Sequence, residues 1–231
     1  NVVLNGDYEE LGSELVTNGD FSSASGWSGS ISVAGGQGTK TGGGLAYQGG
    51  VITSGKQYKI VVDVASLDGT TNIYTGGNSS AALTVGLQTI YMTGGSSNDF
   101  LGINNGYSGG VGSVFNSISV KQVDPNDRWT LDSNWSIVNG KATSTGNGRM
   151  YQSISQFESA SSIGTTVEVT FNIVERTSGG VVVNCYGGVS SEFNTVGTHS
   201  FITTTTNNLN LYFNNSGAGN LVGSIDNVTV R

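Results

Sequence analysis

Apolar and polar residues alternate with a period of two in several short stretches of the chain. In residues 58–65 the apolar positions Tyr58, Ile60, Val62 and Val64 alternate with Lys59 and Asp63. Residues 167–173 repeat this pattern with different side chains. A period of two in a short run places one face on a core and the other in water, as in an antiparallel sheet. These stretches therefore predict half-buried β-strands.

Turn-forming residues separate the predicted strands. Glycine occurs 37 times and proline once, while charged residues make up only 11% of the chain. Pairs such as Asp68-Gly69, Asn105-Gly106 and Asn139-Gly140 are typical of tight turns between strands. No stretch has the period of a long helix. Many short strands joined by polar turns predict an all-β fold built as β-sandwiches.

The same pattern occurs twice, about 110 residues apart. Residues 58–64 match 167–173, and 114–120 match 224–230. A repeat this long marks two copies of a whole domain rather than a solenoid. We place the copies at 14–123 and 124–231, divided by the turn-forming Asp124-Pro125-Asn126-Asp127. Residues 1–13 are expected to be a linker or the stump of a preceding element.

Four motifs follow one another in a fixed order. They are an N-G-x-F opening followed by Trp, a strand ending in Gln, a G-x-x-Y strand entry and a closing I-D-N-V-x-V. They stand here as Asn18-Gly19-Asp20-Phe21 with Trp27, Tyr47-Gln48, Gly55-Lys56-Gln57-Tyr58 and residues 225–230. In this order they resemble carbohydrate-binding modules of the family 4/9/22 type. The resemblance implies two tandem jelly-roll β-sandwich domains and a glycan or polysaccharide ligand.

Modules of this type often hold a structural calcium ion between the opening segment and the closing Asp. The resemblance therefore implies Ca²⁺ with Asp20 and Asp226 as protein ligands. Calcium takes roughly six to eight oxygen ligands. The first copy has Asn116 at the closing position, and in the second copy residues 126–129 stand where the opening motif stood, so neither copy keeps both halves. The alternative is that Asp226 and Asn227 only satisfy backbone groups.

Charge and cysteine content exclude several classes of partner. The net charge is −7, whereas nucleic acids and anionic membranes attract basic patches. No apolar run approaches the roughly 20 residues that span a bilayer. The single cysteine, Cys185, lies in a predicted strand and is expected to be a small buried hydrophobe. We therefore expect no nucleic acid, no membrane insertion and no multi-cysteine metal site.

The sequence does not indicate an enzyme. Glycoside hydrolysis needs a pair of carboxylates about 5–10 Å apart, one with a raised pKa. No acidic pair recurs in both copies with its surroundings. The only histidine, His199, lies in an alternating strand at the position that matches Gln88 of the first copy. This gives no support for a catalytic triad.

Sugar recognition uses exposed aromatic rings together with amide and hydroxyl side chains. The candidate ligand-binding residues come from positions where both copies place similar residues or from the neighbourhood of Gly-Gly turns. These candidates are Tyr47, Gln48, Tyr74, Tyr151, Gln152 and Tyr186. Weaker candidates are Tyr91, Tyr107 and Tyr212. Trp27, Trp135, Tyr58 and Phe171 are expected in the core.

Two functions fit these observations. The first is a non-catalytic carbohydrate-binding or host-adhesion module, whose weak sites are doubled for avidity. The alternative is a structural decoration or appendage protein of a virion or surface filament that binds no sugar, packs against other subunits and forms a homo-oligomer. Both place the protein outside the cell or on a virion surface, as in phage tail fibres.

Overall fold

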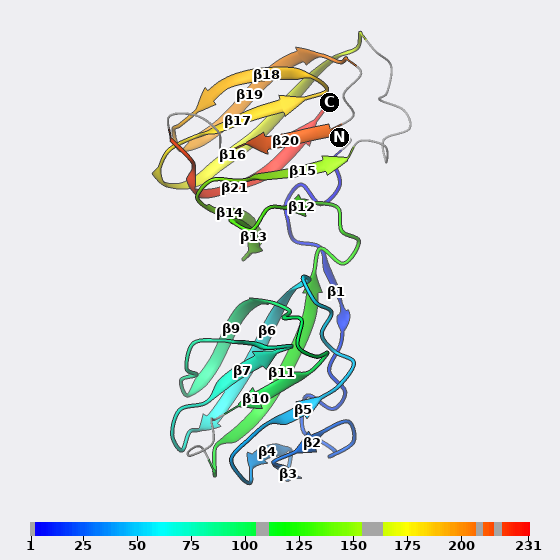
Figure 1. Cartoon of the computed structure of the whole chain (residues 1–231), viewed down its shortest axis with the longest axis vertical. Coiled ribbons are helices and arrows are strands. Elements are labelled where there is room, and N and C mark those ends of the chain that lie inside the picture. The colour runs from blue at the N-terminus through cyan, green and yellow to red at the C-terminus, as the bar shows by residue number, and fades with distance from the viewer. Residues whose placement is uncertain (1–2, 105–110, 154–163, 207–209, 215–218) are drawn as a thin grey trace. The chain divides into compact units, whose positions relative to one another are not determined.

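The computed structural model describes residues 3–104, 111–153, 164–206, 210–214 and 219–231. These residues form strands joined by turns (Figure 1), which confirms the all-β fold. No helix that could span a membrane occurs among the described residues. The chain divides into two compact units: Leu11–Val123, and a second that combines Asn1–Glu10 with Asp124–Arg231. We call these the first and the second domain.

The first domain contains two antiparallel sheets. One has the order β3-β4-β11-β6-β9, with β1 pairing β11, and the other has the order β2-β5-β10-β7-β8. The strands are β1 Leu11–Glu14, β2 Ser28–Gly29, β3 Ile31–Ala34, β4 Gln37–Lys40, β5 Ala46–Gln48, β6 Gln57–Ser66, β7 Asn72–Thr75, β8 Asn78–Ser79, β9 Gly86–Thr93, β10 Leu101–Asn104 and β11 Val114–Val123.

The second domain repeats this architecture. Its sheets have the orders β12-β15-β20-β17-β18 and β13-β14-β21-β16-β19. The strands are β12 Thr130–Leu131, β13 Trp135–Val138, β14 Lys141–Thr145, β15 Arg149–Ser153, β16 Thr166–Ser178, β17 Val181–Cys185, β18 Gly188–Phe193, β19 Gly197–Thr204, β20 Asn210–Asn214 and β21 Val222–Val230.

The buried faces of the two sheets supply the core of each domain. In β6, buried and half-buried residues alternate along most of the strand, as the period of two predicts. The four aromatics expected in the core, Trp27, Trp135, Tyr58 and Phe171, are all buried. The paired sheets with their alternating strands fit two jelly-roll β-sandwiches.

Residues 3–10, which we call the clasp, differ from the expected linker. They belong to the second domain, so the first domain is inserted between the clasp and Asp124. The physical reason is burial: Val3 and Tyr8 are 6% and 1% exposed, and the Tyr8 ring packs against Trp129 with centroids 5.3 Å apart. Residues 11–13 belong to the first domain instead, because Leu11 pairs with Val123 there.

The clasp supplies the opening motif of the second domain. In the first domain, the Asn18 carbonyl accepts hydrogen bonds from Phe21 N at 3.1 Å and Trp27 Nε1 at 3.1 Å. The Asn5 carbonyl accepts the equivalent bonds from Tyr8 N at 3.2 Å and Trp129 Nε1 at 2.9 Å. Trp129 therefore takes the part of Trp27, and the motif expected at 126–129 comes from residues 5–8.

Candidate functional site

The candidate site of the first domain is a row of residues across the outer face of sheet β2-β5-β10-β7-β8. The strand register places Tyr47 opposite Gly102, and Gly102 opposite Tyr74. Ser28 and Ser79 continue the row onto the edge strands. Both tyrosines are half-buried, while their neighbours along each strand point into the core. The row therefore presents two aromatic rings on strands separated by β10.

The surroundings hold both rings in place. Tyr47 stacks on Phe100 with ring centroids 4.5 Å apart and an angle of 23°. The Tyr74 hydroxyl accepts a hydrogen bond of 2.8 Å from Asn98 Nδ2. Gly102 carries no side chain, and Leu45 packs over it: a Cβ there would come within 2.1 Å of Leu45 Cδ2. Rings fixed in this way offer apolar surface at little cost in side-chain entropy.

The second domain carries the corresponding row on sheet β12-β15-β20-β17-β18, with a different sequence. The register places Tyr151 opposite Tyr212, and Tyr212 opposite Asn184. The tyrosine rings lie 5.2 Å apart, and the Arg149 guanidinium carbon lies 5.7 and 5.8 Å from their centroids. Asn210 Nδ2 donates a 2.8 Å hydrogen bond to the Tyr212 hydroxyl. The row thus combines two rings, a cation and amides.

Asn184 offers a buried acceptor in this row. Its Oδ1 has no hydrogen-bond partner among the described residues. A buried amide oxygen without a partner costs about 1–3 kcal/mol of stability.

Gln48 and Gln152 are not available to a ligand from the outer face. Each side chain is buried and hydrogen-bonded at both ends to one backbone residue. Gln48 Oε1 accepts from Thr17 N at 3.0 Å, and its Nε2 donates to Thr17 O at 2.6 Å. Gln152 makes the same pair of bonds with Leu4, at 3.0 and 2.8 Å. Their common position in both copies therefore reflects a structural role.

Tyr186 is likewise a core residue. Strand β17 ends at Cys185, and Tyr186 has a positive φ of 54°, so its side chain leaves the alternation and turns inward. It is 1% exposed, and burial raises the pKa of Tyr186 to about 12. The register makes Asn184 the equivalent of Tyr74. Tyr74 lies opposite Gly102 of β10, and Asn184 lies opposite Tyr212 of β20.

Tyr212, one of the weaker candidates, shares the outer face with Tyr151. It lies in β20 opposite both Tyr151 and Asn184. The signal available in the sequence was the alternation of Leu211 and Phe213 with Tyr212, which places the tyrosine on the outer face. Tyr91 lies on β9, in the other sheet of the first domain. Tyr107 falls outside the described residues.

The two aspartates proposed for calcium belong to different domains. Asp20 Oδ1 accepts hydrogen bonds from Ser22 N and Oγ, and these bonds lower the pKa of Asp20. Asp226 Oδ1 accepts from Asn227 N at 2.7 Å. Asp20 therefore bonds groups of its own turn and Asp226 bonds its neighbour within β21, and the described residues contain no cluster of three metal-binding side chains. Calcium at these aspartates stays a prediction to be tested.

The clasp changes one part of the calcium expectation. Asp7 follows Asn5-Gly6 as Asp20 follows Asn18-Gly19, and Asp7 belongs to the same domain as Asp226. A pocket of about 330 Å³ adjoins it, lined by Val3, Asn5, Gly6, Asp7, Asn227, Val228 and Thr229. Asp7 is the only carboxylate in that lining.

The residues considered for catalysis have structural surroundings. His199 packs its ring on Phe171 and Phe193, at 5.5 and 5.0 Å, and bonds the Thr195 carbonyl. Cys185 is buried, as expected, and burial raises the pKa of its thiol to about 12. At that pKa the thiol stays protonated and unreactive at neutral pH.

Comparisons with known proteins identify likenesses of fold. No family model and no curated protein matches the chain. Among solved structures, the tandem CBM22 domains of Xyn10C from Paenibacillus barcinonensis are 10% identical, cover 95% of this chain and 97% of their own, and give a TM-score of 0.33. The M60 catalytic domain with two CBM51 domains of Clostridium perfringens ZmpB is 6% identical, covering 84% and 34%, with a TM-score of 0.22.

A conserved protein of unknown function from Pseudomonas aeruginosa is 10% identical, covering 82% of this chain and 78% of its own, with a TM-score of 0.20. Tandem carbohydrate-binding modules are thus among the structural neighbours. TM-scores this low do not transfer a function from one protein to another.

Proposed function

We propose that the protein is a non-catalytic carbohydrate-binding module with one binding face in each domain. The observation that carries the proposal is the pair of aromatic rows at corresponding register positions. Tyr47 and Tyr74 form the row of the first domain, and Tyr151 and Tyr212 form that of the second. The apolar face of a sugar ring packs on such rings, and nearby amides and hydroxyls read its hydroxyl groups.

The two faces have different chemistry. The first is neutral and apolar, since Leu45 covers the strip between Tyr47 and Tyr74. The second places a guanidinium over its rings and the Asn210 amide beside them. Each face is expected to bind weakly, and two faces on one chain raise the avidity for a repetitive polysaccharide. The expected setting is extracellular or at a virion surface, beside other surface subunits.

The test is a glycan array followed by calorimetry on single-face variants. Tyr47→Ala and Tyr151→Ala should each weaken binding by about 1–3 kcal/mol, the usual range for a stacking aromatic. Tyr91→Ala is the matched control, because Tyr91 lies on the other sheet and should change nothing.

Unchanged melting temperatures are required, since both rings are half-buried rather than core residues. A wild-type chain that binds no glycan and forms a defined oligomer would overturn the proposal in favour of a structural appendage protein.

A further inference from the structure

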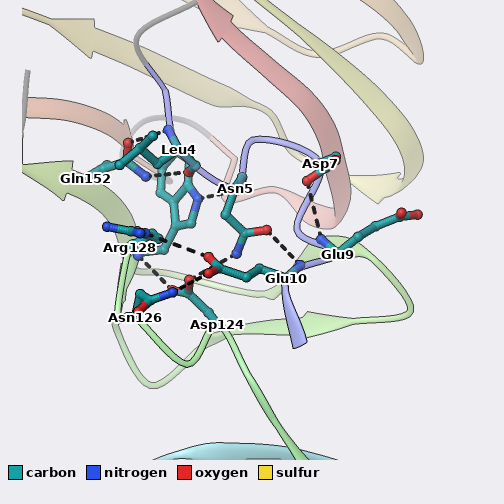
Figure 2. A network of polar contacts seen from close by, with 10 residues as sticks. Leu4, Asn5, Asp7, Glu9, Glu10, Asp124, Asn126, Arg128 and Gln152 are labelled. Atoms are coloured by element: carbon teal, nitrogen blue, oxygen red, sulfur yellow. Dashed lines mark hydrogen bonds and ion pairs between the residues drawn. The ribbon is translucent and has the colours of Figure 1, made fainter. Parts of the chain in front are cut away.

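The clasp is held in the second domain entirely by non-covalent contacts, which Figure 2 shows from close by. In the sequence, the whole first domain lies between the clasp and the rest of the second domain. We call the residues within 124–231 that contact the clasp the groove. The groove can be described by three kinds of contact with that segment.

Apolar packing anchors the aromatic residue of the segment. Tyr8 is fully buried and its ring lies 5.3 Å from that of Trp129. Its hydroxyl reaches Met150 Sδ at 3.8 Å. Burial, together with the charges of Asp226 and Asp124, raises the pKa of Tyr8 well above its ordinary value, so the ring is neutral in the groove.

Backbone contacts select glycine at Gly6, two residues before the aromatic residue Tyr8. The Gly6 carbonyl accepts a 2.8 Å hydrogen bond from Val228 N. A Cβ at Gly6 would lie 2.2 Å from the Val228 carbonyl oxygen, so no other residue fits without moving β21. The groove therefore recognises an Asn-Gly sequence by its close approach.

Polar contacts fix the two ends of the segment. At its start, Gln152 bonds both Leu4 N and Leu4 O. At its end, Arg128 Nε lies 3.7 Å from Glu10 Oε2, and Asn126 Nδ2 donates to Glu10 Oε1. Between them, Asp124 Oδ1 accepts from Asn5 Nδ2 at 3.0 Å. Every one of these groove residues lies within 124–231.

The first domain makes the same contacts with a segment that is continuous with its own chain. Gly19 O accepts from Ile118 N at 2.7 Å, and a Cβ at Gly19 would lie 2.0 Å from Ile118 O. The Phe21 and Trp27 rings lie 5.2 Å apart. The glycine and aromatic contacts are therefore the same whether the segment directly precedes its domain in the sequence or is separated from it by the first domain.

We propose that the groove of residues 124–231 is a peptide-binding site for an Asn-Gly-acidic-aromatic segment. The groove binds the clasp of its own chain in the intact molecule. It also binds the same segment when a second molecule of the chain supplies it. Such exchange is a form of strand complementation, in which a domain is completed by a segment from another chain. It links copies through their second domains.

The test cuts the folded full chain and leaves the groove intact. A protease recognition sequence is inserted between Gly12 and Ser13, where the pairing of β1 with β11 shifts register. After cleavage of the folded protein, native mass spectrometry records whether the peptide 1–12 stays bound. A fluorescent synthetic peptide 1–12 is then added, and exchange is followed by anisotropy. A peptide with Gly6→Ala is the matched control.

We expect the cut peptide to remain bound and to exchange with the labelled peptide. The Gly6→Ala peptide should compete at least about tenfold more weakly, because its methyl group would overlap backbone. If the cut peptide leaves and added peptide neither binds nor restores amide protection in 124–231, the proposal is wrong. Equal competition by the Gly6→Ala peptide would also overturn it. A sugar-binding result of either sign leaves both outcomes unaffected.

Discussion

Replacing Tyr8 by alanine tests directly whether the second domain is discontinuous. Tyr8 is 1% exposed and packs on Trp129. Truncating a buried aromatic to alanine typically costs about 3–5 kcal/mol, since it loses packing and leaves a cavity. For a domain of this size about 3–6 °C is lost per kcal/mol, so the unfolding midpoint of the second domain should fall by roughly 10–25 °C.

The assay is hydrogen exchange read peptide by peptide, together with calorimetry. Amides in β15 and β21 should lose protection in Tyr8→Ala, while those of β6 and β11 keep it. Phe21→Ala is the matched control, because Phe21 holds the equivalent place in the first domain and should produce the reverse pattern. A Tyr8→Ala protein with unchanged exchange in β15 and β21 would refute the reasoning and restore residues 1–10 as a linker.

Three further predictions concern the buried residues Lys40 and Gln48 and the two aspartates proposed for calcium. Burial lowers the pKa of Lys40 from 10.5 to about 8. Between these pH values the unfolded state binds more protons than the folded state. The first domain should therefore become more stable as pH rises from 8 to 10.5. Lys40→Met should remove that pH dependence and, at about 1.4 kcal/mol per pKa unit, add up to about 3 kcal/mol at pH 7; an unchanged slope in urea unfolding would contradict this. Gln48→Ala leaves Thr17 N and O without their partner and should cost the first domain about 1–3 kcal/mol, measured by urea unfolding, with no change expected in the second. Because Asp20 Oδ1 and Asp226 Oδ1 already accept hydrogen bonds from neighbouring residues, EGTA should leave the melting temperature unchanged, and a clear downward shift would reveal a bound ion.

The sequence predicted the features that depend on local pattern. Alternation located the long strands at 58–65 and 167–173, which lie within β6 and β16. It also placed Tyr58 and Phe171 in the core, because a strand with one wet face leaves no other place for a large inward side chain. Pattern and repeat together were sufficient for the fold class.

The arrangement of the second domain depended on pairing at long range, which alternation does not encode. The echo of Asn18–Phe21 in residues 5–8 was visible in the sequence, but only the contacts of Gly6 and Tyr8 show which domain uses it. Reading the chain as consecutive domains assigned the motif to neither copy. A local motif does not say which domain it completes when another domain is inserted between them.

The site residues were predicted in part for a similar reason. Tyr47, Tyr74 and Tyr151 lie on the outer faces, whereas Tyr186 is buried. Tyr186 follows the end of β17 with a positive φ, which turns its side chain inward, and its place beside a Gly-Gly pair does not reveal this. Alternation placed Tyr212 on the outer face, but its position beside Tyr151 and Asn184 follows only from the register of β20 between β15 and β17.

The measurement that tests the central claim most directly is glycan binding by the intact chain beside the double variant Tyr47→Ala with Tyr151→Ala. We predict that the wild-type chain binds a defined set of glycans, and that the double variant loses this binding while keeping the wild-type melting temperature. Binding that survives in the folded double variant would show that the aromatic rows are not the binding faces.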